Sequence, residues 1–203
     1  MRRGETVILA AGDFPRKGGE AWGLLERAKR VVACDSAADA YRRRFGRWPT
    51  VVVGDMDSAR GALAADSGCR VVRVAEQDDN DLAKAAAYCA SRGWRNPVVV
   101  GACGKREDHA IGNIFLALDL GLEIVTEHGR FVPLCGRRTF AVRLGAAVSV
   151  FATDLATRME SRGLEWPLKG VRFRSLYCAT LNRATASRVT LSSTRPVLVF
   201  LSR

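Results

Sequence analysis

The sequence predicts an α/β domain with a mostly parallel sheet, followed by a small all-β domain that forms a sandwich or barrel. Over the first ~125 residues, short apolar runs alternate with helical patterns, which is typical of βαβ units. Further along, strand-like runs are separated by glycine, arginine-pair and serine-pair turns, and no comparable helical period recurs. A chain of 203 residues can hold one large or two small domains. We therefore expect one domain at residues 1–126 and a second at residues 127–203.

The elements of the first domain follow from apolar runs, helical periods and the residues that punctuate them. Pro49 and Pro97 each precede a valine run, and Gly93 follows the last periodic residue of a helical pattern. The expected strands are residues 6–11, 31–34, 50–53, 70–74, 98–100 and 122–126. The expected helices are residues 20–30, 37–45, 59–66, 82–91 and 108–120.

The second domain contains only strand-like segments. They are residues 131–134, 139–144, 147–152, 171–178, 187–192 and 197–201. Because so short a region buries little surface by itself, we expect it to pack on the first domain, on a second copy of the chain, or on both.

Composition indicates a soluble protein of the reducing cytoplasm. Apolar residues make up 48% and charged residues 26%, as in ordinary globular proteins. No run approaches the ~20 apolar residues that span a bilayer, and the apolar segment near the N-terminus is too short for a signal peptide. The six cysteines are scattered without a C-x-x-C pair, so neither a zinc site nor a redox motif is expected.

The net charge of +11 raises nucleic acid as a possible partner. The basic residues are mostly arginines spread along the chain, and no interleaving of aromatic and basic residues resembles an RNA- or DNA-binding module. We therefore attribute the charge to a general compositional bias and expect no nucleic-acid partner. Such a charge would also attract a small anionic substrate.

The sequence Gly-Asp-Met-Asp-Ser at residues 54–58 organises the first domain, because it directly follows a buried valine strand. In an extended chain residues i and i+2 point to the same side, so Asp55 and Asp57 can converge on one cation. Open α/β sheets bind ligands beyond the carboxyl ends of their strands, where this pair falls. The alternative is a solvated loop in which Ser58 caps the next helix.

A second acidic turn, Glu-Gln-Asp-Asp-Asn-Asp at residues 76–81, lies between a predicted strand and a predicted helix. Asp81 occupies the expected N-cap position, and capping together with the helix dipole would account for one or two of the acids. Four acids in six residues repel one another, so a bound divalent cation explains the turn better. Asp78 and Asp81 are the expected ligands from this turn.

A glycine-rich turn, Gly-Ala-Cys-Gly-Lys-Arg at residues 101–106, joins a buried valine strand to a helix. Its amides and the helix N-terminus can hold an anion. Lys105 and Arg106 add donors suited to phosphate. The spacing of a P-loop is absent.

The helix after this turn carries three more polar side chains. Asp108 is a possible N-cap. His109 and Asn113 share a helix face at i and i+4, which places both near the same opening of the predicted site. By itself His109 is better explained as a structural residue than as a catalyst.

Three such turns at the ends of different strands suggest metal-assisted transfer from a nucleoside triphosphate. The sequence also resembles the thiamine pyrophosphokinase family, whose motifs recur in the same order along nearly the whole chain. The family's G-D-x-D-S is matched at residues 54–58, D-x-D-x-T-D is similar to 76–81, and G-x-x-G-G-R-x-D-H-x-x-x-N is similar to 101–113. Its D-G-G-A, G-L-x-[WY]-x-L and Ser-Asn motifs resemble residues 35–38, 161–168 and 181–182.

The resemblance implies transfer of a diphosphate group from ATP to the hydroxyl of thiamine, with Mg²⁺, giving thiamine diphosphate and AMP. It also implies a homodimer in which thiamine binds where the β domain of one subunit meets the α/β domain of the other. The residues expected in catalysis and as Mg²⁺ ligands are Asp55, Asp57, Asp78 and Asp81. Those expected to bind ATP are Asp35, Ser36, Gly101, Gly104, Lys105, Arg106, Asp108, His109 and Asn113. Those expected to bind thiamine are Ser161, Trp166 and Asn182.

Trp166 is the candidate for stacking on the flat cationic ring of the substrate, and the alternative is a tryptophan in the core of the β domain. The sequence also departs from the family motifs at several positions. They are Ser36, Ala37, Glu76, Asn80, Lys105 and Leu181. Two other functions stay open: a pyrophosphokinase for another hydroxymethyl heterocycle such as a pterin, and a nucleotide- or RNA-binding module without catalysis.

Overall fold

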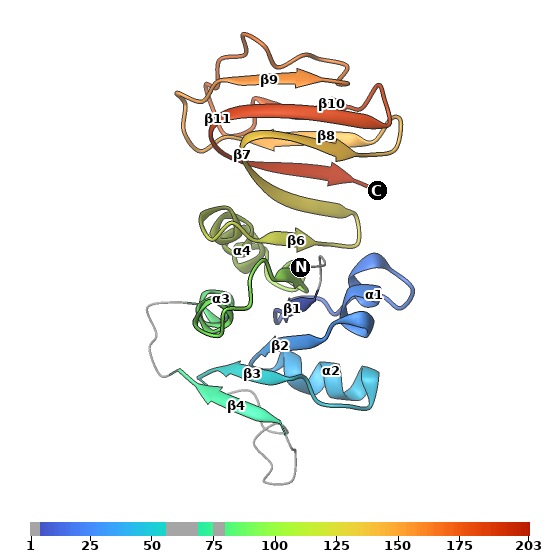
Figure 1. The fold of residues 1–203 in the computed structure, drawn as a ribbon, viewed down its shortest axis with the longest axis vertical. Helices are drawn as coiled ribbons and strands as arrows, with labels where there is room; N and C mark the ends of the chain where they lie inside the picture. The colour runs from blue at the N-terminus through green and yellow to red at the C-terminus, as the bar shows by residue number, and fades with distance from the viewer. Residues whose placement is uncertain (1–4, 56–68, 75–79) are drawn as a thin grey trace. The chain divides into compact units, whose positions relative to one another are not determined.

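The computed structural model of the protein describes residues 5–55, 69–74 and 80–203 (Figure 1). The expected helix at 59–66 therefore lies outside the described residues, as do Asp57, Glu76 and Asp78. The chain divides into two compact units. Unit 1 comprises Met1–Leu116 and Leu122–Glu127, and unit 2 comprises Ala117–Gly121 and His128–Arg203.

Unit 1 is built on a parallel sheet with the strand order β4-β3-β2-β1-β5-β6. Its strands are β1 (Thr6–Leu9), β2 (Arg30–Cys34), β3 (Val51–Gly54), β4 (Arg70–Arg73), β5 (Val98–Val100) and β6 (Glu123–Val125). The central strands are apolar on both faces because both are covered, and Val7, Ile8 and Leu9 are fully buried. All six expected strands are confirmed, with ends that differ by at most two residues.

Four helices belong to the described part of the chain. They are α1 (Glu20–Arg27), α2 (Ala37–Phe45), α3 (Asp81–Ser91) and α4 (Glu107–Asp119). In unit 1, α1 and α2 pack on one side of the sheet and α3 on the other (Figure 1). Helix α1 ends three residues before the predicted residue 30, because the backbone amides of Lys29 and Arg30 donate to the Glu5 carbonyl and lead the chain into β2.

Two predicted helix starts are wrong. Asn80, not Asp81, is the N-cap of α3: its side chain accepts a hydrogen bond from the Ala83 amide at 2.9 Å. Helix α4 begins at Glu107, so Asp108 lies inside the first turn and is not an N-cap. In both cases the helix starts one residue earlier than predicted, within the ordinary uncertainty of helix ends.

Unit 2 is an antiparallel β structure. Its strands are β7 (Gly129–Ala141), β8 (Ala147–Phe151), β9 (Met159–Arg162), β10 (Ala179–Arg183) and β11 (Arg188–Ser202). Strand β11 pairs with β7 along most of its length, with β9 through its first half and with β8 through its second half, and β10 pairs with β8. The inward-facing side chains form one apolar cluster, in which Val189, Leu191, Val197 and Val199 are fully buried.

The predicted strands of unit 2 were partly wrong. The segment 131–134 and the first half of 139–144 belong to the single strand β7, which ends at Ala141. The segments 187–192, from residue 188 on, and 197–201 belong to β11, with an irregularity between Ser193 and Val197. The segment 171–178 is not a strand, although Phe173 points into the core. Strands β9 and β10 were missed because their sequences, Met-Glu-Ser-Arg and Ala-Thr-Leu-Asn-Arg, show little apolar alternation.

The helices of the described part of the chain are all too short or too polar to cross a membrane.

Candidate functional site

A cavity of about 550 Å³ opens in unit 1 beyond the carboxyl ends of the parallel strands. From β1 the strands follow in order toward one edge of the sheet, which ends with β4. The chain then returns to the other side of β1 and adds β5 and β6 toward the opposite edge. The carboxyl ends of β1 and β5 therefore flank a topological switch point, where open α/β sheets bind their ligands. The predicted site residues that line the cavity are Asp55, Asp81, Gly104, Lys105, Arg106, His109 and Asn113.

The turns after β1 and β5 lie against each other through their backbones. The Gly12 amide donates to the Gly101 carbonyl and the Asp13 amide to the Cys103 carbonyl, both at 2.8 Å. A Cβ on Gly12 would lie 2.4 Å from both of those carbonyl oxygens, so only glycine allows this approach. Gly104 has φ +84°, and a Cβ there would lie 2.2 Å from an Asp13 carboxylate oxygen. The two turns thus form one rigid wall of the cavity.

Lys105 follows Gly104 in a left-handed conformation, with φ 58°. A side chain in this conformation costs on the order of 1 kcal/mol relative to glycine. Its ammonium donates to the Ala11 carbonyl at 2.7 Å, which keeps the charge over the turn that follows β1. The backbone therefore keeps a glycine-like shape while the side chain adds a cation to the cavity.

Arg106 forms a two-point contact with Asp108 at the rim of the cavity. Its Nε and Nη2 donate to the two carboxylate oxygens at 3.1 and 2.5 Å. This pairing with Arg106 lowers the pKa of Asp108 to about 2. Both side chains are exposed, so the pair fixes the direction of the guanidinium more than it stabilises the fold. His109 is also exposed and lines the cavity, so it is not a buried structural histidine.

Acidic side chains gather on the other side of the cavity. Asp81 begins α3, and partial burial raises the pKa of its carboxyl, as do the charges of Asp35 and Asp55. Lys84, itself buried, lies 3.9 Å from the Asp81 carboxylate and opposes that rise in pKa. Asp35 is buried at the end of β2 with φ 38°, close against Gly54. Ser36 is the N-cap of α2, and its side chain makes no capping bond.

A divalent cation suits this arrangement because its charge would favour the ionised form of Asp81, which partial burial and, to a smaller extent, the charges of Asp35 and Asp55 disfavour. Within residues 5–55, 69–74 and 80–203, no three His, Cys, Asp or Glu side chains converge as a ready metal site. Asp57 and Asp78, the other two expected ligands, are not among those residues. The described part of the chain thus supplies Asp55 and Asp81 from the predicted set.

A chain of amide side chains connects three parts of the site. Asn80 donates from Nδ2 to Oδ1 of Asn113 at 3.2 Å, and Asn113 donates to the Ala102 carbonyl at 2.9 Å. The start of α3, the helix α4 and the turn after β5 are therefore held together. Asn80 is a departure from the family motif, and its spacing in the sequence gave no sign that it contacts Asn113.

Cys34 and Lys84 also line the cavity and were not predicted. The Cys34 thiol is fully buried and donates to the Asp81 carbonyl at 3.4 Å, and burial raises its pKa. It is therefore an inert thiol that fixes the start of α3. Lys84 could have been suspected from its i+3 spacing to Asp81 on a helix whose neighbouring side chains are apolar.

The residues expected to bind thiamine lie in unit 2. The side-chain amide of Asn182 accepts from the Trp166 backbone amide at 3.2 Å and donates to the Trp166 carbonyl at 2.6 Å. Asn182 is buried, whereas the Trp166 side chain is 55% exposed and so is not a core tryptophan. The Ser161 hydroxyl accepts a hydrogen bond from the Leu168 amide at 2.9 Å. Asn182 and Ser161 thus shape the segment that presents Trp166 to solvent.

Comparison with known proteins adds to this geometry. Residues 21–125 match the family described as thiamin pyrophosphokinase, catalytic domain, and residues 129–200 match thiamin pyrophosphokinase, substrate-binding domain. The chain belongs to the thiamin pyrophosphokinase family. Membership confirms the enzyme class expected from the sequence, a diphosphotransferase, and the thiamin pyrophosphokinase activity.

Individual relatives agree with this assignment. Thiamin pyrophosphokinase 1 of Caenorhabditis elegans is 26% identical over 211 residues, which cover 86% of this chain and 79% of that protein. The structure of thiamin pyrophosphokinase from Geobacillus thermodenitrificans has a TM-score of 0.76 at 22% identity, with 98% of this chain and 97% of that chain covered. The structure from Candida albicans has a TM-score of 0.78 at 14% identity, with 97% and 88% covered. The fold is therefore that of the thiamin pyrophosphokinases.

We predict that Asp81→Asn stabilises the metal-free protein at neutral pH. Because the folded-state pKa of Asp81 is raised, folding favours its protonated form, and the charged form lowers stability at pH values above that pKa. The asparagine variant should melt roughly 1–3 °C higher than the wild type at pH 7, and this advantage should shrink as the pH falls and Asp81 takes up a proton.

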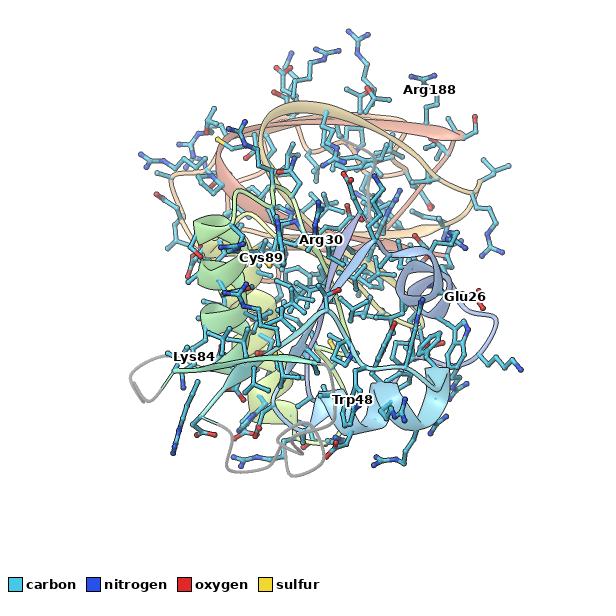
Figure 2. All side chains as sticks on the ribbon, turned by 60° about the horizontal axis from the view of Figure 1, so that its bottom comes forward. Glu26, Arg30, Trp48, Lys84, Cys89 and Arg188 are labelled. Atoms are coloured by element: carbon cyan, nitrogen blue, oxygen red, sulfur yellow. The ribbon has the colours of Figure 1, made fainter. Side chains whose placement is uncertain are left out.

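Differential scanning calorimetry in chelator between pH 4 and 8 checks this prediction. Glu26→Gln is the control, because it removes one exposed carboxylate from α1 on the same unit (Figure 2). A lower melting temperature for Asp81→Asn at pH 7 would contradict the account of its pKa.

Proposed function

We propose that unit 1 binds ATP with its phosphates in the cavity at the ends of β1 and β5, and that unit 2 binds thiamine so that its hydroxyl attacks the β-phosphorus. The observation that carries the proposal is the division of the cavity into two chemically different walls. One wall has the glycine-rich turn with the cations Lys105 and Arg106, which suit phosphate oxygens. The other has Asp55 and Asp81, which suit Mg²⁺.

Mg²⁺ would be held by Asp55 and Asp81 together with Asp57 and Asp78, directly or through water. When bound, it neutralises phosphate charge and orients the β- and γ-phosphates. Arg106, fixed by Asp108, supplies charge to the same phosphates from the rim. The amide chain from Asn80 to Asn113 keeps the two walls at a fixed separation.

The reaction is an in-line displacement at the β-phosphorus of ATP. The hydroxyl oxygen of thiamine forms a bond to that phosphorus, and the bond from phosphorus to the oxygen bridging the α- and β-phosphates breaks. AMP leaves with that oxygen, and thiamine keeps the diphosphate. A carboxylate of the second acidic turn accepts the hydroxyl proton. The cations of the glycine-rich turn stabilise the charge that develops on the phosphates.

We further propose that residues 1–126 form the ATP- and metal-binding domain, and that residues 127–203 serve thiamine binding and formation of a homodimer. Large apolar side chains that are exposed on unit 2, Trp166, Tyr177 and Leu181, support an interface there. A cytoplasmic location is supported by the six cysteines, each in the described part of the chain and each a free thiol.

The first prediction of this proposal concerns turnover. Purified protein with ATP, Mg²⁺ and thiamine should produce AMP and thiamine diphosphate, and a chelator should stop both. Asp55→Asn should lower kcat at least about 10³-fold because it removes a proposed Mg²⁺ ligand, while the melting temperature stays within a few degrees. Asp39→Asn, on α2 and not among the residues that line the cavity, is the control and should keep full activity.

Coupled detection of AMP and chromatography of the thiamine products measure both outcomes. Full activity of Asp55→Asn would remove Asp55 from the mechanism. AMP released only with another hydroxymethyl heterocycle, such as a pterin alcohol, would replace thiamine as the acceptor.

The second prediction concerns Lys105. Lys105→Gly removes a cation from the phosphate wall, so the KM for ATP should rise roughly fivefold to tenfold. It also relieves the left-handed conformation, so the melting temperature should stay the same or rise by up to about 3 °C. Asn96→Gly is the matched control, since Asn96 also has a positive φ of 52° and precedes β5 at the opposite end of that strand. Asn96→Gly should leave the KM for ATP unchanged, and equal kinetics for both variants would exclude Lys105 from nucleotide binding.

The third prediction concerns Trp166. Because an exposed indole can stack on the cationic ring of thiamine, Trp166→Ala should raise the KM for thiamine about tenfold and leave the KM for ATP unchanged. Trp166→Phe should recover most of the loss. A KM for thiamine that is insensitive to both changes would place the acceptor elsewhere.

A further inference from the structure

The positive charge of the protein is concentrated in unit 2. Residues 128–203, which are all of unit 2 except residues 117–121, hold 13 of the 32 basic residues but only 3 of the 21 acidic ones, a net charge of +10, which leaves +1 for residues 1–127. A general compositional bias would give both parts of the chain a similar excess of positive charge. In residues 1–127 the basic residues are nearly balanced by acidic ones, so such a bias does not explain the charge. The excess on unit 2 arises from a local scarcity of acids.

One face of unit 2 collects unpaired arginines in a regular pattern. Along β11, Val189 and Leu191 point into the core, so Arg188, Thr190 and Ser192 point outward. The strand register places Thr190 between Thr139 of β7 and Arg162 of β9, and Ser192 between Arg137 of β7 and Glu160 of β9. We call the outward-facing set Arg137, Thr139, Glu160, Arg162, Arg188, Thr190 and Ser192 the basic face.

The basic face presents hydroxyl groups with guanidinium groups around them. The Thr139 and Thr190 hydroxyl oxygens lie 2.8 Å apart at the centre. Arg188, labelled in Figure 2, is exposed at the start of β11. The ion pairs of unit 2 use other arginines, Arg183 with Glu165 and Arg195 with Asp154. Among the described residues, Arg137, Arg162 and Arg188 form no ion pair.

The chemistry of this face selects among anionic partners. It carries no aromatic or large apolar side chain, so it offers neither a stacking platform for single-stranded bases nor an apolar anchor for a membrane. A second copy of the same face would oppose arginine with arginine. Guanidinium and hydroxyl groups are the donors that contact a nucleic-acid backbone without reading its sequence. Hydroxyl side chains can also pair with ribose 2′-hydroxyls.

We propose that the basic face of unit 2 binds the backbone of double-stranded RNA, without sequence preference and separately from diphosphate transfer. Its three arginines contact phosphates, and Thr139, Thr190 and Ser192 contact phosphates or 2′-hydroxyls across the minor groove. The interaction is driven largely by release of counterions from the RNA and so depends steeply on salt.

The test uses the full-length protein and a fluorescent RNA duplex of about 20 base pairs, long enough for one backbone-binding surface. Anisotropy titrations at several salt concentrations give the Kd and its salt dependence. Changing Arg137, Arg162 and Arg188 together to Gln should weaken binding at least tenfold and reduce the slope of log K against log salt by roughly 2–3.

The matched control changes Arg43, Arg92 and Arg95 to Gln, three exposed arginines of unit 1 that give the same loss of net charge. It should keep wild-type RNA affinity, and both triple variants should keep wild-type turnover of ATP and thiamine, which shows that they are folded. Equal weakening in both triple variants, or in neither, would overturn the proposal.

Two other ligands complete the test. Equal affinity for a DNA duplex of the same length would overturn the choice of RNA and the contacts to 2′-hydroxyls. Binding to vesicles rich in phosphatidylserine without binding to RNA would overturn the proposal in favour of a lipid surface. If the wild-type protein transferred no diphosphate to thiamine, that result would contradict the proposed function and leave the RNA proposal untouched. The RNA titration contains neither ATP nor thiamine, so the two outcomes are independent.

Discussion

The site depends on the close approach of two backbone turns at the centre of the sheet of unit 1. Gly12 contacts the carbonyls of Gly101 and Cys103 at a distance that excludes any Cβ. This contact fixes the wall that carries the cations, and the amide bridge from Asn80 to Asn113 ties the acidic side to it. The cavity is therefore defined by backbone geometry, while the side chains determine which ligand fits.

Two departures from the family motifs lie at backbone positions with a positive φ. Lys105 and Leu181 both hold positive φ values, 58° and 63°. At Lys105 the family has glycine, so the backbone shape is kept and a charged group is added. Leu181 is 85% exposed, beside Asn182, which supports the Trp166 segment. At these two positions the substitutions change the side chain that the turn exposes, while the backbone keeps a conformation that favours glycine.

Much of the site was predictable because parallel strands deliver their carboxyl ends to one edge. Asp55 and the glycine-rich turn were found from short patterns next to buried valine runs. Pairs that are distant in sequence were not, such as the Asn80–Asn113 bridge and the Cys34 bond to Asp81, because spacing carries no information about them. In unit 2, the short polar strands β9 and β10 owe their pairing to neighbouring strands, so their own sequences gave little signal.

The pairing of β11 has a consequence for how the chain folds during its synthesis. Residues 188–202 supply partners for β7, β8 and β9, and the β7 pairing alone joins residues about 50 to 70 positions apart. The described strands of unit 1, β1 to β6, all precede residue 126 and pair without residues 188–202. Unit 1 can therefore fold while the ribosome is still translating unit 2. The apolar side chains of unit 2 stay exposed until its last strand emerges, and this interval is when the chain most needs protection from aggregation.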